Sequence, residues 1–216
     1  GALRQGAQAL LRQGLHSKAE DLAARAAQKF RLAGRQLDHG LALNLVAGVR
    51  LQMLAGAEAL RALRGGSASA EARLARSRRE GALSAAEEAA RVLREQVTED
   101  NDKEGKKALA AALHNVAAAK LLFQEHGAAR ELAEEALDLL CAAGEEAGQA
   151  PVLLVLSEAL LAGGQSRGAA RASEQARVLF ARQGLKAASA AAAHVLGASW
   201  QRRGQRQHFA PMPERP

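Results

Sequence analysis

Residues 129–144, ARELAEEALDLLCAAG, decide the fold of this chain. Alanine and leucine recur in the stretch at intervals of three and four residues, which places them on one face of an α-helix. The glycine that closes the stretch suits a helix end, where a left-handed backbone is favoured. Residues 169–184, AARASEQARVLFARQG, repeat the pattern forty residues later. The sequence therefore predicts a helical unit that is repeated along the chain.

Three stretches that end at Gly34, Gly144 and Gly184 share four positions. Residues 82–97 keep the same face, with Val97 in place of the glycine. A plain helical bundle with coincidental spacing is the alternative, but four shared offsets in three stretches favour a true repeat. The shared positions lie four, eight, twelve and fifteen residues before the glycine: Phe30, Leu140 and Phe180; Ala26, Ala136 and Ala176; Leu22, Leu132 and Ala172; Ala19, Ala129 and Ala169.

A second series of glycines marks the other turn of each unit, so that each unit becomes a pair of antiparallel helices. In the second unit, Gly65–Gly66–Ser67 is expected to break the first helix and Gly81 to end a short, Arg-rich second helix. A half-unit precedes the first pair, and residues 205–216 form a tail whose three prolines prevent it from being helical throughout. The second series is Gly14, Gly56, Gly127, Gly164 and Gly204. The predicted solenoid covers residues 1–204, and its units are 15–56, 57–81 (degenerate), 82–127, 128–164 and 165–204.

Composition supports an all-α fold. The chain contains no Ile and no Tyr, and Thr98 is its only Thr. Because strands favour β-branched and aromatic residues, little remains from which a sheet could be built.

The alanine spacing resembles the tetratricopeptide repeat (TPR) family. The residues that carry the resemblance are Ala19, Ala129 and Ala169, followed seven residues later by Ala26, Ala136 and Ala176. The period is closer to the longer variants of the family, of roughly 40 residues, than to its standard 34. The resemblance implies a right-handed α-solenoid whose first helices line a concave groove for peptides or partner subunits.

Charge divides the chain into three parts. Residues 1–80 carry a net charge of +8, residues 81–164 carry −8 and residues 165–216 carry +7. Basic ends around an acidic middle predict surfaces for different neighbours rather than one continuous nucleic-acid stripe. The basic clusters, which could contact phosphates in RNA or lipid headgroups, are Arg73, Arg76, Arg78 and Arg79, and Arg202, Arg203 and Arg206.

No pattern of catalytic residues, cofactor ligands or metal ligands is found. The histidines do not form an i, i+4 pair, and the glycine pairs lack the frame of a phosphate-binding loop. We interpret His126 as a residue at a helix C-terminus, Cys141 as a small buried hydrophobe and 99–104 as a polar linker. The sequence therefore predicts a protein that is not an enzyme.

Candidate partner-binding residues come from the repeat positions, the basic end and the tail. Asn44 and Asn115 each lie twelve residues before a glycine of the second series, where an amide could bind a peptide backbone. The alternative is an ordinary polar residue on an exposed helix face. Phe209 is expected to anchor the tail in a pocket of a partner or of the last helix pair, against the alternative of a disordered end. The remaining candidates are Arg50, Glu158, Gln201, Arg202, Arg203 and Arg206.

These observations predict an interaction scaffold, as an accessory or peripheral structural subunit of a larger complex, such as an organellar photosynthetic or respiratory assembly. An RNA-binding or ribosome-associated repeat protein that uses the basic ends is the alternative. The longest apolar stretch, Val152 to Leu161, is too short to span a bilayer, which leaves peripheral contact with a membrane complex open. The chain begins at Gly1 rather than Met, which fits a processed organellar precursor or an incomplete record.

Overall fold

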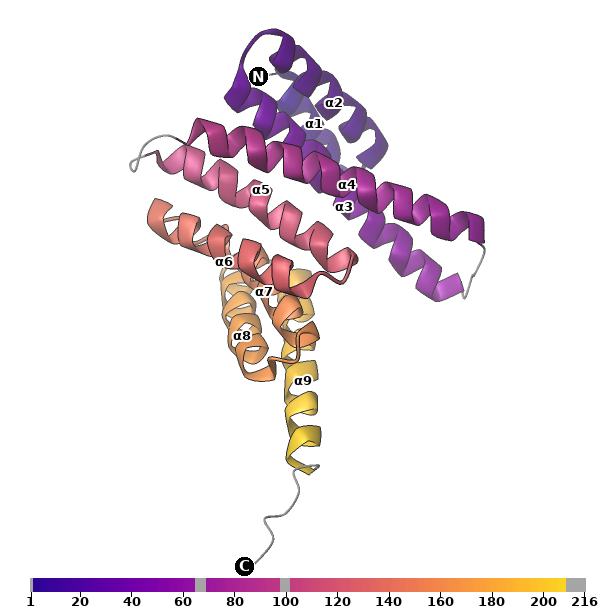
Figure 1. The fold of residues 1–216 in the computed structure, drawn as a ribbon, viewed down its shortest axis with the longest axis vertical. Coiled ribbons are helices and arrows are strands. Elements are labelled where there is room, and N and C mark those ends of the chain that lie inside the picture. Colours follow the sequence, from indigo (N-terminus) through magenta and orange to yellow (C-terminus); the bar gives the residue numbers. More distant parts are fainter. Residues whose placement is uncertain (1, 65–68, 98–101, 209–216) are drawn as a thin grey trace, which may run out of the picture.

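The computed structural model describes residues 2–64, 69–97 and 102–208, except for the side chains of 58–64, 69–72 and 203–208. In these residues the regular structure is α-helical throughout, and each helix packs against the next along the chain (Figure 1). The all-α prediction is confirmed. The helices are α1 (Ala2–Arg12), α2 (His16–Leu32), α3 (Gln36–Arg64), α4 (Ser69–Gln96), α5 (Lys103–Leu122), α6 (His126–Ala143), α7 (Gln149–Ala162), α8 (Ser166–Arg182) and α9 (Lys186–His208).

The helices form two layers with different spacing. Odd-numbered helices contact one another in succession, α1 with α3, α3 with α5, α5 with α7 and α7 with α9. Among the described residues the backbones of the even-numbered helices do not approach one another in this way, although long side chains still join them. In a curved stack the more closely spaced layer lies on the inside, so the odd helices line the concave side of the solenoid.

Alanines occupy the positions where neighbouring helices cross. Ala19, Ala26, Ala129, Ala136 and Ala176 are fully buried, as the repeat register predicts. Small side chains let the helix backbones approach closely, and the larger Phe30, Leu140 and Phe180 fill the space at the helix ends. The apolar faces become a continuous core only when the helices stack.

The first glycine series marks real turns. Gly34, Gly144 and Gly184 have φ of +68°, +69° and +73°, the left-handed conformation that ends a helix. The second series is partly wrong. Gly14 and Gly164 are left-handed turn residues, but Gly56, Gly127 and Gly204 lie inside α3, α6 and α9.

The turn between α5 and α6 is made by Gln124, with φ of +61°. Because this residue is not glycine, the spacing of glycines could not locate the turn. A non-glycine residue carries some strain in this conformation, which the packing of α5 on α6 can offset.

The predicted unit 57–81 does not exist as a separate helix pair. Its two halves extend α3 and α4, which reach 29 and 28 residues and pack against each other over their length. Their far ends project from the stack as an arm (Figure 1). Gly81 does not end a helix, since a single glycine weakens a helix by only about 1 kcal/mol and tertiary packing can offset that loss.

Residues 102–104 begin a helix rather than continue a linker. The carboxylate of Asp102 accepts a hydrogen bond from the backbone N–H of Gly105 at 2.8 Å, and this caps α5. At the other end of the chain, α9 continues to His208, so residues 205–208 are helical and the rest of the expected tail, with Phe209, lies outside the described residues.

In the part of the chain that the structure describes, one segment is long and apolar enough to cross a membrane, judged by length and composition alone. It is Gln36–Ala57 in α3, with a mean hydropathy of 1.3. α3 packs against α2, α4 and α5, and residues such as Ala42, Ala47 and Val49 are fully buried there. The segment is therefore explained as part of the helical core.

Candidate protein-binding groove

A groove of about 500 Å³ lies on the concave side of the N-terminal half. α1, α3 and α5 each contribute side chains, so the groove belongs entirely to the odd layer. Its floor combines leucine side chains with two asparagines. The lining residues are Arg4, Gln8, Leu37, Leu41, Asn44, Leu45, Gly48, Glu104, Lys107, Ala108 and Asn115.

Asn44 and Asn115 meet in this groove. The side-chain Nδ2 of Asn115 donates to the Oδ1 of Asn44 at 2.7 Å and to the backbone oxygen of Asn44 at 3.2 Å. Both residues are half-buried. The contact does not arise from a shared offset to a turn, because Gly56 and Gly127 are helical; it arises because α3 and α5 are neighbours in the odd layer.

The asparagine pair leaves hydrogen-bonding groups open to the groove. The Nδ2 of Asn44 and the Oδ1 of Asn115 make no further hydrogen bond within the described residues. The pair therefore has one donor and one acceptor left over, and a peptide group carries the complementary acceptor and donor.

The charged side chains at the groove are already paired. The ammonium group of Lys107 lies 2.9 Å from Glu104 and 3.1 Å from Glu145, and hydrogen bonds to these two carboxylates raise the pKa of Lys107. Arg4 lies 3.6 Å from Asp38 across α1 and α3. The groove therefore presents amides and leucines rather than unpaired charge.

The solved structures that this chain resembles include two of a single kind, each covering 96% of this chain with a TM-score of 0.61. One is the set of nearly identical TPR-like repeats of a Podosopora anserina protein named as a kinesin light chain, at 16% identity and with 88% of that chain covered. The other is a point variant of the same protein, at 17% identity and 87% coverage. The chain has a TPR-like fold. No family model matches the sequence, and no curated protein matches it.

Within this TPR-like stack, Arg50 lies away from the groove. Its guanidinium contacts the carboxylate of Glu20 on α2 at 2.7 Å and donates to the backbone oxygen of Gly81 on α4 at 2.8 Å. It borders a separate cleft of about 340 Å³ among α2, α3 and α4. Arg50 therefore joins three helices of the TPR-like core, a contact that the sequence analysis did not anticipate.

The other candidates lie on the C-terminal half. Glu158 on α7 reaches solvent, yet desolvation by the surrounding protein raises the pKa of its carboxyl group. Gln201 is exposed near the end of α9, and Arg202 donates to the backbone oxygen of Leu161. Arg203 and Arg206 belong to α9, but their side chains are outside the description. None of these residues lines the asparagine groove.

Two residues differ from their sequence interpretation. His126 begins α6 rather than ending a helix, because the preceding turn lies at Gln124. Cys141 is exposed, since it falls on the outer face of α6 beside the buried Leu140. A separate feature is the ring of His114 on α5, which is desolvated so strongly that its pKa falls to about 4. Its Nδ1 atom is buried without a hydrogen-bond partner.

The two basic clusters do not come together. Arg73, Arg76 and Arg78 are exposed on the arm part of α4, where Arg76 pairs with Glu80 at 2.9 Å. Arg202 lies on α9, at the other end of the stack (Figure 1). Among the described residues no group of three or more His, Cys, Asp and Glu side chains could hold a metal ion.

Proposed function

We propose that this chain is a non-catalytic interaction scaffold that holds an extended protein segment in the groove of α1, α3 and α5. The observation that carries the proposal is the Asn44–Asn115 pair, which lines the groove and leaves one donor and one acceptor without a hydrogen bond among the described residues. An extended peptide has an unpaired N–H and C=O at each residue, and such a donor and acceptor can satisfy one of these pairs.

The composition of the groove favours a segment with apolar side chains. Leu41, Leu45 and Ala108 supply apolar surface beside the amides. Burial of apolar side chains contributes roughly 25 cal/mol for each Å² removed from water, whereas the paired charges of Lys107 and Arg4 offer little to a charged ligand. The amides orient the peptide and the leucines supply affinity.

A role as an accessory subunit of a larger complex is part of the same proposal. The support is the TPR-like fold together with two distinct surfaces, the concave groove and the basic C-terminal end. RNA binding through the basic clusters is the competing function, and its affinity would fall steeply with added salt because phosphate contacts release counterions.

The experiment uses a matched pair of glycine substitutions on α3. A Cβ at Gly48 would lie 3.6 Å from the Nδ2 of Asn115, so Gly48→Arg fits the backbone and fills the groove. Gly56→Arg introduces the same charge on the same helix, at a position with no other atom within 4 Å. Each immobilised variant is incubated with an extract of the native source, and the retained proteins are quantified by mass spectrometry.

We expect a defined set of proteins to be retained by the wild type and by Gly56→Arg and lost with Gly48→Arg. If all three chains retain the same proteins, the groove is not the binding site. If RNA is retained instead, and is released by salt equally from all three, the competing function is correct.

A further inference from the structure

The last odd helix carries a surface that earlier odd helices bury. The left-handed glycines Gly34, Gly144 and Gly184 bring α3, α7 and α9 into one register. Twelve and sixteen residues after each glycine lie Val46 and Arg50, Leu156 and Leu160, and Leu196 and Trp200.

In α3 and α7 these positions contact the next even helix. Arg50 donates to the backbone oxygen of Gly81 on α4. A Cβ at Gly168 of α8 would lie only 3.3 Å from a methyl group of Leu160, so Leu160 packs directly on that glycine. In both cases the large side chain of the odd helix meets a glycine of the following even helix.

In α9 the same positions are less buried. Trp200 is 57% exposed, whereas Leu160 is only 9% exposed. Leu196 is half-buried, whereas its counterparts Val46 and Leu156 are buried. A hollow of about 670 Å³ lies between α8 and α9, where among the described residues no further helix packs. It is lined by Ser166, Arg167, Ala170, Arg171, Glu174, Gln175, Leu196, Ser199 and Trp200.

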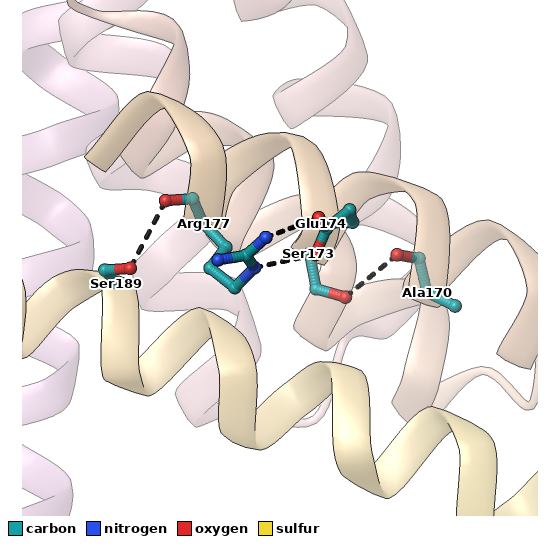
Figure 2. Close-up of polar contacts among 5 residues, drawn as sticks. All are labelled: Ala170, Ser173, Glu174, Arg177 and Ser189. Atoms are coloured by element: carbon teal, nitrogen blue, oxygen red, sulfur yellow. Dashed lines mark hydrogen bonds and ion pairs between the residues drawn. The ribbon is translucent and has the colours of Figure 1, made fainter. Parts of the chain in front are cut away.

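The rim of this hollow is positively charged. Arg167 and Arg171 are exposed and form no ion pair with another described side chain. Glu174, the acidic residue of the rim, is engaged by Arg177 through two hydrogen bonds of 2.6 and 2.7 Å (Figure 2). The hydroxyl of Ser166 is buried in the same hollow without a hydrogen-bond partner. The unbalanced charge of the rim therefore favours an acidic ligand.

We propose that the open face of α8 and α9 binds an acidic amphipathic helix of a partner protein, which takes the place of a following even helix. The partner helix presents a small residue to Trp200, as Gly168 does to Leu160, and carboxylates to Arg167 and Arg171. The chain already contains such a charge contact between successive even helices, since Arg94 of α4 lies 2.6 Å from Glu135 of α6.

Charge also distinguishes this occupant from a second copy of the chain. A two-fold contact of α9 on α9 would bring the two sets of Arg167 and Arg171 toward each other, and like charges at an interface oppose association. The groove of α1, α3 and α5 is a separate surface, so this proposal does not depend on the one made above for that groove.

The chain itself offers a reporter and matched probes. It contains one Trp and no Tyr, so indole fluorescence reports on Trp200 alone. The acidic probe is a synthetic peptide of residues 126–143 with Cys141→Ser. It contains four carboxylate side chains and one Arg, and Gly127 supplies a small residue in its first turn. The basic control is a peptide of residues 166–182, in which four Arg oppose one Glu.

We expect the acidic peptide to shift the Trp200 emission of the full chain to shorter wavelength in a saturable way, and the basic peptide to leave it unchanged. The double variant Arg167→Glu, Arg171→Glu should bind the acidic peptide about tenfold more weakly and gain binding of the basic peptide, because exposed charge pairs contribute up to ~1 kcal/mol each. Circular dichroism should show that the variant keeps its helices, since both arginines are exposed.

Four results would overturn the proposal. These are no shift with the acidic peptide up to about 1 mM, equal responses to both peptides, or an unchanged preference after charge reversal. The fourth is evidence that the chain covers the face itself. This would be a change in Trp200 emission at concentrations where sedimentation shows a dimer, or a change in Trp200 emission after deletion of residues 209–216.

Discussion

α7 and α9 carry the same repeat position in two different environments. Leu160 on α7 is buried against Gly168, and Trp200 on α9, sixteen residues after its own left-handed glycine, is mostly exposed. The two helices share their periodicity, and a left-handed glycine precedes each of them. What differs is whether another helix packs on the face, so burial in a stacked fold depends on the neighbouring unit and not on the local sequence.

The largest difference in the free energy of unfolding is expected between alanine variants of Leu160 and of Trp200. Leu160→Ala removes buried methyl groups and leaves a cavity beside Gly168, so the free energy of unfolding should fall by about 2–5 kcal/mol. Trp200→Ala should change it by less than ~0.5 kcal/mol, although it removes a larger side chain. Chemical denaturation measures both variants, and equal losses would show that the face of α9 is already covered.

The pH dependence of folding stability should differ between a histidine inside the stack and one on α9. His114, whose Nδ1 atom is buried, has a pKa of about 4, below its ordinary value of 6.5, because desolvation disfavours its charged form. Between these two values the unfolded chain binds the proton and the folded chain does not, so folding stability is lost as pH falls from 6.5 to about 4. The loss from this residue is on the order of 3 kcal/mol.

His114→Gln should flatten the stability profile between pH 6.5 and 4, since the titrating group is gone. His194→Gln is the matched control, because His194 is exposed on α9. Urea unfolding at a series of pH values gives the two profiles. Parallel profiles for the wild type and His114→Gln would mean that another group causes the pH dependence.

Replacement of a buried alanine by leucine tests whether alanines are required where neighbouring helices cross. Ala136 on α6 is fully buried, and its replacement by leucine should lower the free energy of unfolding by about 1–3 kcal/mol. Ala147 lies exposed in the turn before α7, and Ala147→Leu should be nearly neutral. Thermal melts compare the two variants; equal melting temperatures would contradict the repeat register.

The smallest effect on stability is expected at the basic end of α9. Replacing Arg202, Arg203 and Arg206 by Glu should lower the free energy of unfolding by about 1 kcal/mol at most, since Arg202 is exposed and gives up one hydrogen bond, to the backbone oxygen of Leu161. Association with an acidic partner should nevertheless weaken, because the attraction becomes repulsion. Quantitative co-purification from the native source measures the association, and an unchanged yield would exclude this end as a docking surface.

The sequence predicted two residues of the candidate site, Asn44 and Asn115, but not the reason why they lie together. Asn44 and Asn115 were chosen from their offsets to Gly56 and Gly127, and both glycines are helical. The asparagines still form a pair, because α3 and α5 are neighbours in the odd layer. Arg50 lies six residues before Gly56, as Glu158 does before Gly164, but Arg50 faces α2 and α4. An offset along one helix does not tell which neighbour the residue meets.

The sequence by itself determined the helices, the left-handed turns at Gly34, Gly144 and Gly184 and the alanine crossings, because these depend on helical periodicity and on the backbone freedom of glycine. Only the tertiary structure decided that α3 and α4 run through Gly56 and Gly81, that Gln124 takes a turn, that Cys141 is exposed and that Trp200 lies on an open face. These features depend on contacts between helices that lie far apart in the chain, and no local pattern of residues records such contacts.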